Sequence, residues 1–250
     1  SYGGAGAIPA YTPFYFTTGS QVWRSSDLAG TDLVAYGATG TGTGQFYGAA
    51  GVALDASGRI YVADTINSRI VRIDDLTGKN WTTFGVQGSG TGQFSAPNGL
   101  AIDSAGRIYV ADSSNNRIVR IDDMSGANWV SYGAAGAGTG QFSHPLSVAV
   151  DATGRIYVPD NGNSRIVRID DMTGANWIAL TQSPNLGGYI YLIQLPVAVA
   201  FDPSGRIFIG EQSNGTGSTI IRIDDMTGTN WTAIYSGNNL NGMSADPSGN

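Results

Sequence analysis

Residues 97–133 read PNGLAIDSAGRIYVADSSNNRIVRIDDMSGANWVSYG, and most of the chain repeats this stretch. Its most regular marker is an aspartate that ends the first apolar run and opens a four-residue segment closed by glycine. The marker recurs at five positions, namely Asp55, Asp103, Asp151, Asp202 and Asp246. Successive markers lie 48, 48, 51 and 44 residues apart. Self-similarity at this period indicates a repeat protein and takes precedence over any local motif.

Each unit contains four short apolar runs that are typical of β-strands, and no segment has a helical period. In the second unit the runs are residues 51–54, 59–62, 69–73 and 81–84. The Asp-x-x-Gly segments between them are signatures of type I turns, in which the aspartate caps backbone N–H groups. Four strands in a unit of this length make one blade of a β-propeller. We therefore expect an all-β fold built from four-stranded antiparallel blades.

The first strand of the unit occurs five times, and the group formed by its second, third and fourth strands also occurs five times. These counts predict a five-bladed propeller. After a Gly/Ala-rich extension at residues 1–12, expected to be flexible, the chain starts at the second strand of a unit and stops after a first strand. We expect this C-terminal strand to complete the N-terminal blade and close the ring, because an unpaired inner edge would be exposed otherwise. The same strand exchanged between chains would produce self-association. A single domain over residues 13–250 is predicted, with blades near 13–37 plus 238–250, 46–85, 94–133, 142–181 and 190–235.

The residues of the fourth unit resemble the NHL repeat. The resemblance is carried by Gln141-Phe142, Pro145, residues 148–151, Gly154, residues 156–158, Asp160, Asn163 and Arg165-Ile166. It implies a propeller of about six blades, so that five is a departure. It also implies protein-binding or RNA-binding modules, with lyases among the relatives that amidate peptides or inactivate antibiotics. Such a fold does not by itself determine an activity.

Composition narrows the classes of partner. The chain carries a net charge of −6 and one lysine, Lys79, which argues against a nucleic-acid partner. No apolar run approaches the roughly 18 residues of a membrane span. Thirty-seven glycines in a chain that is 13% charged indicate many tight turns. Abundant Gly, Ser, Thr and Asn suit an extracellular or cell-surface protein, with the periplasm as the second location.

The recurring polar residues have a structural and a functional interpretation. Asp64, Asn67 and Arg69, with their copies in the next two units, form either a ring of ligand groups or, as we favour, a turn held by an Asp–Arg pair. The segment 74–80 is either a calcium loop or a capped turn, and we favour the turn because no distal glutamate follows. Four tryptophans, Trp81, Trp129, Trp177 and Trp231, either bind sugars or cover the seams between blades. We favour the seams.

Catalytic residues are few. The chain has one histidine, His144, and no cysteine, so a multi-histidine zinc site cannot be built. The lyases that the resemblance implies depend on histidines, and this chain departs from them. A calcium-dependent lyase or hydrolase at the mouth of the central channel is an alternative, with calcium as its cofactor.

The fifth unit departs from the repeat and marks the predicted site. Residues 183–194 replace the Gly-Thr-Gly-Gln-Phe run that precedes the other units. The loop between the second and third strands is three residues longer, and Glu211 and Thr219 stand where the other units have the aspartate and the arginine that flank this loop. Since these changes fall on one face of the propeller, we expect a ligand site there. Its predicted residues are His144, Asp160, Tyr189, Tyr191, Gln194, Glu211 and Asn239. The predicted function is a non-catalytic binding or scaffold module with a protein or glycan partner; a multivalent glycan-binding propeller and the calcium-dependent enzyme are the alternatives.

Overall fold

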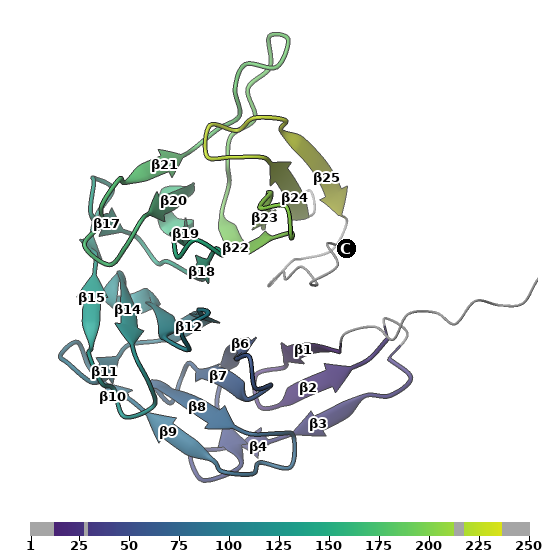
Figure 1. The fold of residues 1–250 in the computed structure, drawn as a ribbon, viewed down its shortest axis with the longest axis vertical. Helices are drawn as coiled ribbons and strands as arrows, with labels where there is room; N and C mark the ends of the chain where they lie inside the picture. Colours follow the sequence, from purple (N-terminus) through teal and green to yellow (C-terminus); the bar gives the residue numbers. More distant parts are fainter. Residues whose placement is uncertain (1–12, 28–29, 213–217, 237–250) are drawn as a thin grey trace, which may run out of the picture.

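The computed structural model describes residues 13–27, 30–212 and 218–236, and nearly all regular structure in them is β-strand. The strands form five small antiparallel sheets arranged in a ring, with their first strands toward the centre (Figure 1). The predicted five-bladed β-propeller is therefore confirmed. Among the described residues, no helix is long and apolar enough to cross a membrane.

The blades are numbered one to five along the chain. Blade one has β1 (Phe14–Thr17), β2 (Val22–Ser25) and β3 (Val34–Tyr36). Blade two has β6 (Ala49–Leu54), β7 (Ile60–Asp64), β8 (Arg69–Ile73) and β9 (Thr82–Phe84). Blade three has β12 (Pro97–Ile102), β13 (Ile108–Asp112), β14 (Arg117–Ile121) and β15 (Val130–Tyr132). Blade four has β18 (Ala149–Val150), β19 (Ile156–Asp160), β20 (Arg165–Ile169) and β21 (Ile178–Leu180). Blade five has β22 (Pro196–Phe201), β23 (Ile207–Glu211), β24 (Ser218–Ile223) and β25 (Thr232–Ser236).

The marker aspartate builds the turn between the first two strands of a blade. Asp103 Oδ1 accepts the backbone N–H groups of Ala105 and Arg107, and Oδ2 accepts Arg107 Nε at 2.6 Å and the Tyr109 hydroxyl at 3.2 Å. Burial raises the pKa of Asp103, but these hydrogen bonds outweigh burial and hold the pKa below its ordinary value. The local sequence alone thus suffices to explain why each unit turns where it does.

The hydrophobic core lies in the seams between successive blades. The cluster between blades two and three joins Tyr61 and Ile70 of one blade to Ile108 and Val119 of the next. A glycine in each outer turn permits this packing: a Cβ on Gly126 would lie 2.3 Å from the ring of Phe84 in the preceding blade. The same turn needs a φ of +80° at Gly126, which favours glycine a second time. Apolar burial therefore helps to hold the blades to one another, together with single backbone hydrogen bonds such as that from Gly99 N to Leu146 O at 2.9 Å.

The Gly-rich connections between blades are folded. Each forms a two-stranded parallel ladder, in which Gly88 N donates to Phe94 O and the Gln93 side chain accepts Gly90 N. The ladders are β4 (Ala38–Thr39) with β5 (Gln45–Phe46), β10 (Val86–Gln87) with β11 (Gln93–Phe94), and β16 (Ala134–Ala135) with β17 (Gln141–Phe142). The sequence did not predict them. Two 3-10 turns, η1 (Ser113–Asn115) and η2 (Asn161–Asn163), complete the elements.

Some predicted boundaries were wrong by a few residues. The second strand of blade two runs on to Asp64, because that aspartate pairs with Arg69 in the ladder, and the fourth strand begins at Thr82 rather than at Trp81. The predicted closing strand at residues 238–250, and with it the proposed strand exchange, lies outside the described residues. So do Asn239, Asp246 and the extension at residues 1–12.

Candidate functional site

In blades two to four, the turn after the second strand holds a buried polar cluster. Asp112 is fully buried, and its oxygens accept Ser95 N at 2.7 Å, Asn115 Nδ2 at 2.8 Å and Arg117 Nε at 2.8 Å. Burial raises the pKa of Asp112 above its ordinary value, although all three donors oppose that rise. Blades two and four repeat the pairing as Asp64–Arg69 and Asp160–Arg165. The cluster is a structural clamp, as the sequence indicated.

The arginine of this clamp reaches into the seam with the preceding blade. Arg117 donates to Ser89 O at 2.7 Å and Gln93 O at 2.9 Å, both in the Gly-rich connection. Its Cζ lies 5.6 Å from the ring centroid of Trp129, and that ring packs 5.3 Å from Phe94. The guanidinium is thus held by a carboxylate, an indole face and backbone carbonyls of the connection. The prediction that these tryptophans cover the seams is confirmed, so Trp81, Trp129 and Trp177 are not open sugar platforms.

Blade five retains part of this clamp and lacks the rest. Glu211 occupies the aspartate position and Thr219 the arginine position, since each pair closes the ladder between the second and third strands. Glu211 is 6% exposed and accepts Gln194 N at 2.8 Å, as Asp112 accepts Ser95 N. Within the described residues it makes no ion pair. Burial raises the pKa of Glu211 to about 7, because the one backbone hydrogen bond does not offset its desolvation.

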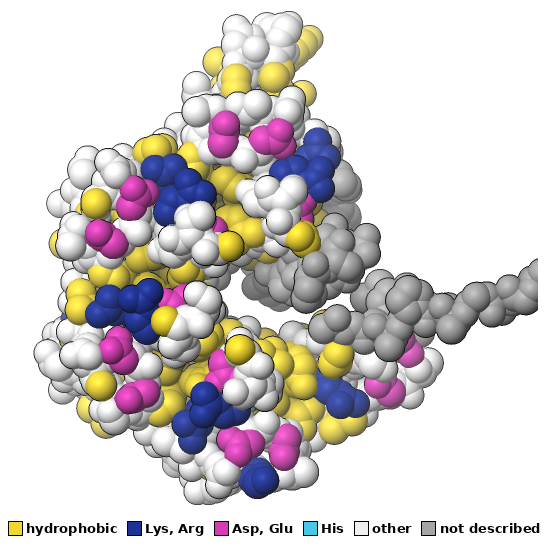
Figure 2. Space-filling view, in the orientation of Figure 1, with side chains coloured by type: hydrophobic (Ala, Val, Ile, Leu, Met, Phe, Trp, Pro, Cys, Tyr) yellow, Lys and Arg dark blue, Asp and Glu magenta, His cyan; other side chains and the backbone are white. Residues whose placement is uncertain are grey.

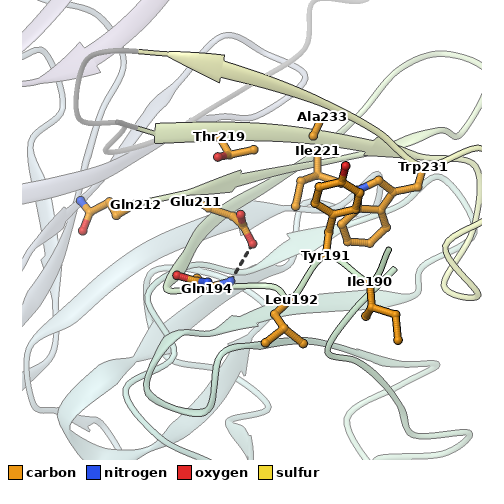
Figure 3. A pocket seen from close by; sticks show the side chains of 10 residues that line it. All are labelled: Ile190, Tyr191, Leu192, Gln194, Glu211, Gln212, Thr219, Ile221, Trp231 and Ala233. Atoms are coloured by element: carbon orange, nitrogen blue, oxygen red, sulfur yellow. Dashed lines mark hydrogen bonds between the residues drawn. The ribbon is translucent and has the colours of Figure 1, made fainter. Parts of the chain in front are cut away.

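A hollow of about 330 Å³ lies beside Glu211. Figure 3 shows Glu211 and Trp231 on different sides of it, with Tyr191 beside the indole. The indole Nε1 of Trp231 is buried and has no hydrogen-bond partner in the described part of the chain. Ile190 and Leu192 add apolar side chains to the lining. The hollow therefore combines a buried carboxylate with two aromatic rings.

Residues 182–192 form a hairpin that projects beyond the ring (Figure 1). Ser183 N donates to Tyr191 O at 2.8 Å, Leu186 N donates to Tyr189 O at 2.9 Å, and Tyr191 N donates to Ser183 Oγ at 3.0 Å. The hairpin is strongly apolar at its surface: Tyr189 is 72% and Leu192 58% exposed. Figure 2 shows its hydrophobic side chains at the top of the molecule, above blades whose basic and acidic side chains lie next to one another.

The structure brings together three of the predicted site residues and separates the others. Tyr191, Gln194 and Glu211 line the hollow, while Tyr189 lies nearer the hairpin tip and Asn239 is outside the described residues. Thr219 and Trp231 line the hollow as well, which was not predicted. Trp231 also packs in the hydrophobic cluster that joins Leu180 to blade five, in agreement with the seam position expected for it.

His144 and Asp160 lie in blade four. Asp160 is fully buried and accepts Ser143 N, Asn163 Nδ2 and Arg165 Nε, so it belongs to the structural clamp of that blade. His144 is exposed, has a φ of +49°, and its backbone N–H donates to Asn116 Oδ1 at 3.0 Å. Asn161 Nδ2 donates to Pro196 O at 3.2 Å and links the two blades on this face.

Among the described residues, no group of three or more His, Asp or Glu side chains lies close enough together to hold a metal ion. The candidate calcium segments are turns: Asp123 accepts Ser125 N at 2.8 Å, and Asp122 accepts Asn128 Nδ2 at 2.7 Å. The side-chain and backbone hydrogen bonds of Ser125 lower the pKa of Asp123. These carboxylates are thus used in capping, as favoured from the sequence.

Several solved structures resemble this propeller. A chain in the crystal structure of a nidogen/laminin complex has a TM-score of 0.69 and 19% identity, over 93% of this chain and 81% of that one. A streptogramin B lyase has a TM-score of 0.58 and 15% identity, over 92% and 70%. Virginiamycin B lyase from Staphylococcus aureus has a TM-score of 0.59 and 16% identity, over 92% and 68%. At these identities the likeness shows the fold alone.

Comparison at the level of sequence gives a family. None of the curated proteins matches the chain. The family model described as "Outer membrane protein assembly factor BamB" matches residues 5–246. This match supports a β-propeller family without singling out the NHL type. The chain belongs to the β-propeller family of the outer membrane protein assembly factor BamB.

Proposed function

We propose that this chain is a non-catalytic binding module that holds a protein partner at blade five. The observation that carries the proposal is the apolar hairpin at residues 182–192 beside a hollow with a buried carboxylate. Exposed apolar surface concentrated on one projecting element is typical of an interaction site. Tyrosine is enriched in such interfaces because it offers contact area with a polar tip. The other four blades act as the scaffold.

The comparisons support the general class of this function. A match to an outer membrane assembly factor, and a structural likeness to a chain in a nidogen/laminin complex, agree with a propeller that binds proteins. The family description also supports a location in the cell envelope, where we place the chain, on the periplasmic or the outer side. The NHL type remains part of the proposal.

Site-specific photo-cross-linking tests the function. Benzoylphenylalanine replaces Tyr189 in one sample and Tyr47, which is 50% exposed on another blade, in the matched control. Irradiated in an envelope extract of the source cells, the chain is expected to give one discrete protein adduct from position 189 and none from position 47. Excess unlabelled chain should compete for the adduct, whereas excess Tyr189→Ser/Tyr191→Ser chain should not.

Two outcomes would contradict this function. Equal adducts from both positions would show that the hairpin is not the docking element. A glycan array on which the chain binds sugars, with binding lost in Trp231→Phe, would replace the protein partner by a glycan. Trp81, Trp129 and Trp177 each pack on a phenylalanine in a seam, so we do not expect sugars to stack on these three rings.

A further inference from the structure

Three blades of this propeller each contain an internal complex of an arginine side chain. In blade two, Arg69 Nε lies 2.7 Å from Asp64, and its Cζ lies 5.8 Å from the Trp81 ring centroid. In blade four, the corresponding distances from Arg165 are 2.8 Å to Asp160 and 5.5 Å to the Trp177 centroid. Blade three repeats this geometry. The fold therefore builds one receptor for a guanidinium three times and fills it from its own chain each time.

Blade five keeps an acid and an indole at the receptor positions, has a different connection where the filled blades supply carbonyls, and lacks the arginine. Glu211 stands at the aspartate position, and Trp231 supplies the indole. Thr219 is too short to fill the place of the guanidinium, and the hollow lies there, between Glu211 and Trp231. The chain has no spare cationic side chain to fill it. All thirteen lysines and arginines lie in the described residues, and none of them pairs with Glu211. Glu211 is 6% exposed and accepts one hydrogen bond from the described residues, so its ionised form is poised for a cation from outside.

We propose that the hollow in blade five receives the guanidinium of an arginine side chain from a protein partner. This inference rests on the proposed function and names the group that the partner inserts. Glu211 would accept the N–H donors of the guanidinium, and the Trp231 face would stack on its plane, as in the three filled blades. Tyr191, Ile190 and Leu192 would cover the aliphatic stem, which packs well on apolar side chains.

Arginine fits this receptor better than lysine does. The guanidinium is planar, stacks on aromatic faces and presents several donors in a fixed fork, whereas the lysine ammonium is a compact and strongly hydrated charge. The filled blades use these properties, since Arg165 donates at once to Asp160 and to the carbonyls of Ala137 and Gln141. The hollow is accordingly expected to discriminate between the two cations.

Three short peptides test the proposal on the full chain: acetyl-Gly-Arg-Gly-amide, its lysine counterpart, and its citrulline counterpart, which keeps the shape of arginine without the charge. Binding is followed at pH 8 by NMR through the indole N–H signal of Trp231, assigned with Trp231→Phe. The arginine peptide is expected to bind at least ten times more tightly than the citrulline peptide and several times more tightly than the lysine peptide. Glu211→Gln should weaken arginine binding about tenfold, the size expected for a charge-assisted hydrogen bond.

The decisive variant is Thr219→Arg, which restores the arginine of the regular blades. It is expected to abolish peptide binding, because its own side chain fills the hollow. Equal binding of the arginine and citrulline peptides would overturn the proposal, and so would unchanged binding in Glu211→Gln. If Thr219→Arg fails to fold, Glu211→Gln and the citrulline peptide still decide.

The two proposals fail in different ways. If position 189 still cross-links a partner and the arginine peptide does not bind, the guanidinium site is wrong and the binding function stands. If the peptide binds and no adduct forms, the receptor exists and the docking function of the hairpin is wrong. If neither occurs, both are wrong.

Discussion

Glu211 and Thr219 face each other across β23 and β24 at the register position where the regular blades place an aspartate opposite an arginine. In those blades the pair is an ion contact of 2.7–2.8 Å. In blade five it leaves a buried acid beside open space. Two changes of residue in a repeated motif, aspartate to Glu211 and arginine to Thr219, thus convert a structural clamp into a candidate receptor, while the antiparallel pairing of the two strands is kept.

Removing the clamp arginine is expected to be costly. Arg117→Ala leaves the fully buried Asp112 without its ion pair and should lower the free energy of unfolding by about 3–5 kcal/mol. Arg107→Ala, the matched control, breaks a pair whose arginine is 39% exposed and should cost at most about 1 kcal/mol. Urea unfolding of both variants measures the difference. Equal losses would show that the clamp is no more than a surface ion pair.

Adding the missing arginine is expected to stabilise the chain. In Thr219→Arg the new side chain pairs with Glu211 and fills the hollow, so the free energy of unfolding should rise by about 1–2 kcal/mol. Thr219→Gln adds a side chain without the charge and serves as control. A Thr219→Arg chain that is less stable than the glutamine variant would mean that blade five cannot hold a guanidinium.

The raised pKa of Glu211 makes stability depend on pH. The folded carboxyl has a pKa of about 7 against an ordinary value of 4.5, so the folded state binds the proton more tightly than the unfolded state does. Its contribution to stability is fully present below pH 4.5 and is lost as the pH rises through 7, by on the order of 3 kcal/mol in all. Tyr191 is the one other titratable residue that lines the hollow.

Glu211→Gln isolates this effect, because glutamine does not titrate. The stability of the natural chain relative to Glu211→Gln is expected to fall steadily from pH 5 to pH 8 in chemical unfolding. Parallel stability profiles of the two chains over this range would contradict a raised pKa. Glu211 also makes the binding of the arginine peptide depend on pH, because the guanidinium pairs with the ionised carboxylate. The affinity for this peptide should therefore drop about tenfold from pH 8 to pH 6.

The seam tryptophans are expected to behave as core residues. Trp129→Ala removes an indole packed between Phe84 and Phe94 and should lower the free energy of unfolding by about 3–5 kcal/mol. Tyr47→Ala, at an exposed aromatic residue, should have little effect. Thermal unfolding compares the two. A Trp129→Ala chain as stable as Tyr47→Ala would mean that the seam does not hold the blades together.

A pair of glycines separates backbone strain from packing. Gly126 and Gly106 have φ values of +80° and +81°, but a Cβ on Gly126 would meet the Phe84 ring, whereas one on Gly106 would meet nothing within 4 Å. Both alanine variants pay a backbone cost of about 1–2 kcal/mol. Only Gly126→Ala adds about 1–3 kcal/mol of overpacking, which Phe84→Ala should partly relieve. Equal losses at the two sites would show that the seam yields freely.

The candidate site was only partly predictable from the chain. The departure of blade five from the repeat pointed to Tyr191, Gln194 and Glu211, because a broken symmetry is visible in an alignment of units. Trp231 was expected to cover a seam, and its place in the hollow with Glu211 could not be predicted, since the Arg–Trp contact of the regular blades joins residues of different strands. Asp160 was grouped with the site from its position on the same face, and only the coordinates show that its oxygens are occupied by Ser143, Asn163 and Arg165.

The sequence by itself determined the units, their strands and their turns, because these depend on contacts a few residues apart. The turn at Asp103 and the run of β8 from Arg69 to Ile73 follow from such local chemistry. Tertiary structure decided what the repeated side chains do. Arg117 donates to the carbonyl of Ser89, 28 residues away, and Gly126 lies against the Phe84 ring. Both contacts form because the ring of blades places the outer turn of one blade against the preceding blade. The hollow beside Glu211 is likewise a tertiary feature: its lining residues all belong to the fifth unit, but Tyr191, Glu211 and Trp231 are far apart in the chain and meet only in the folded blade.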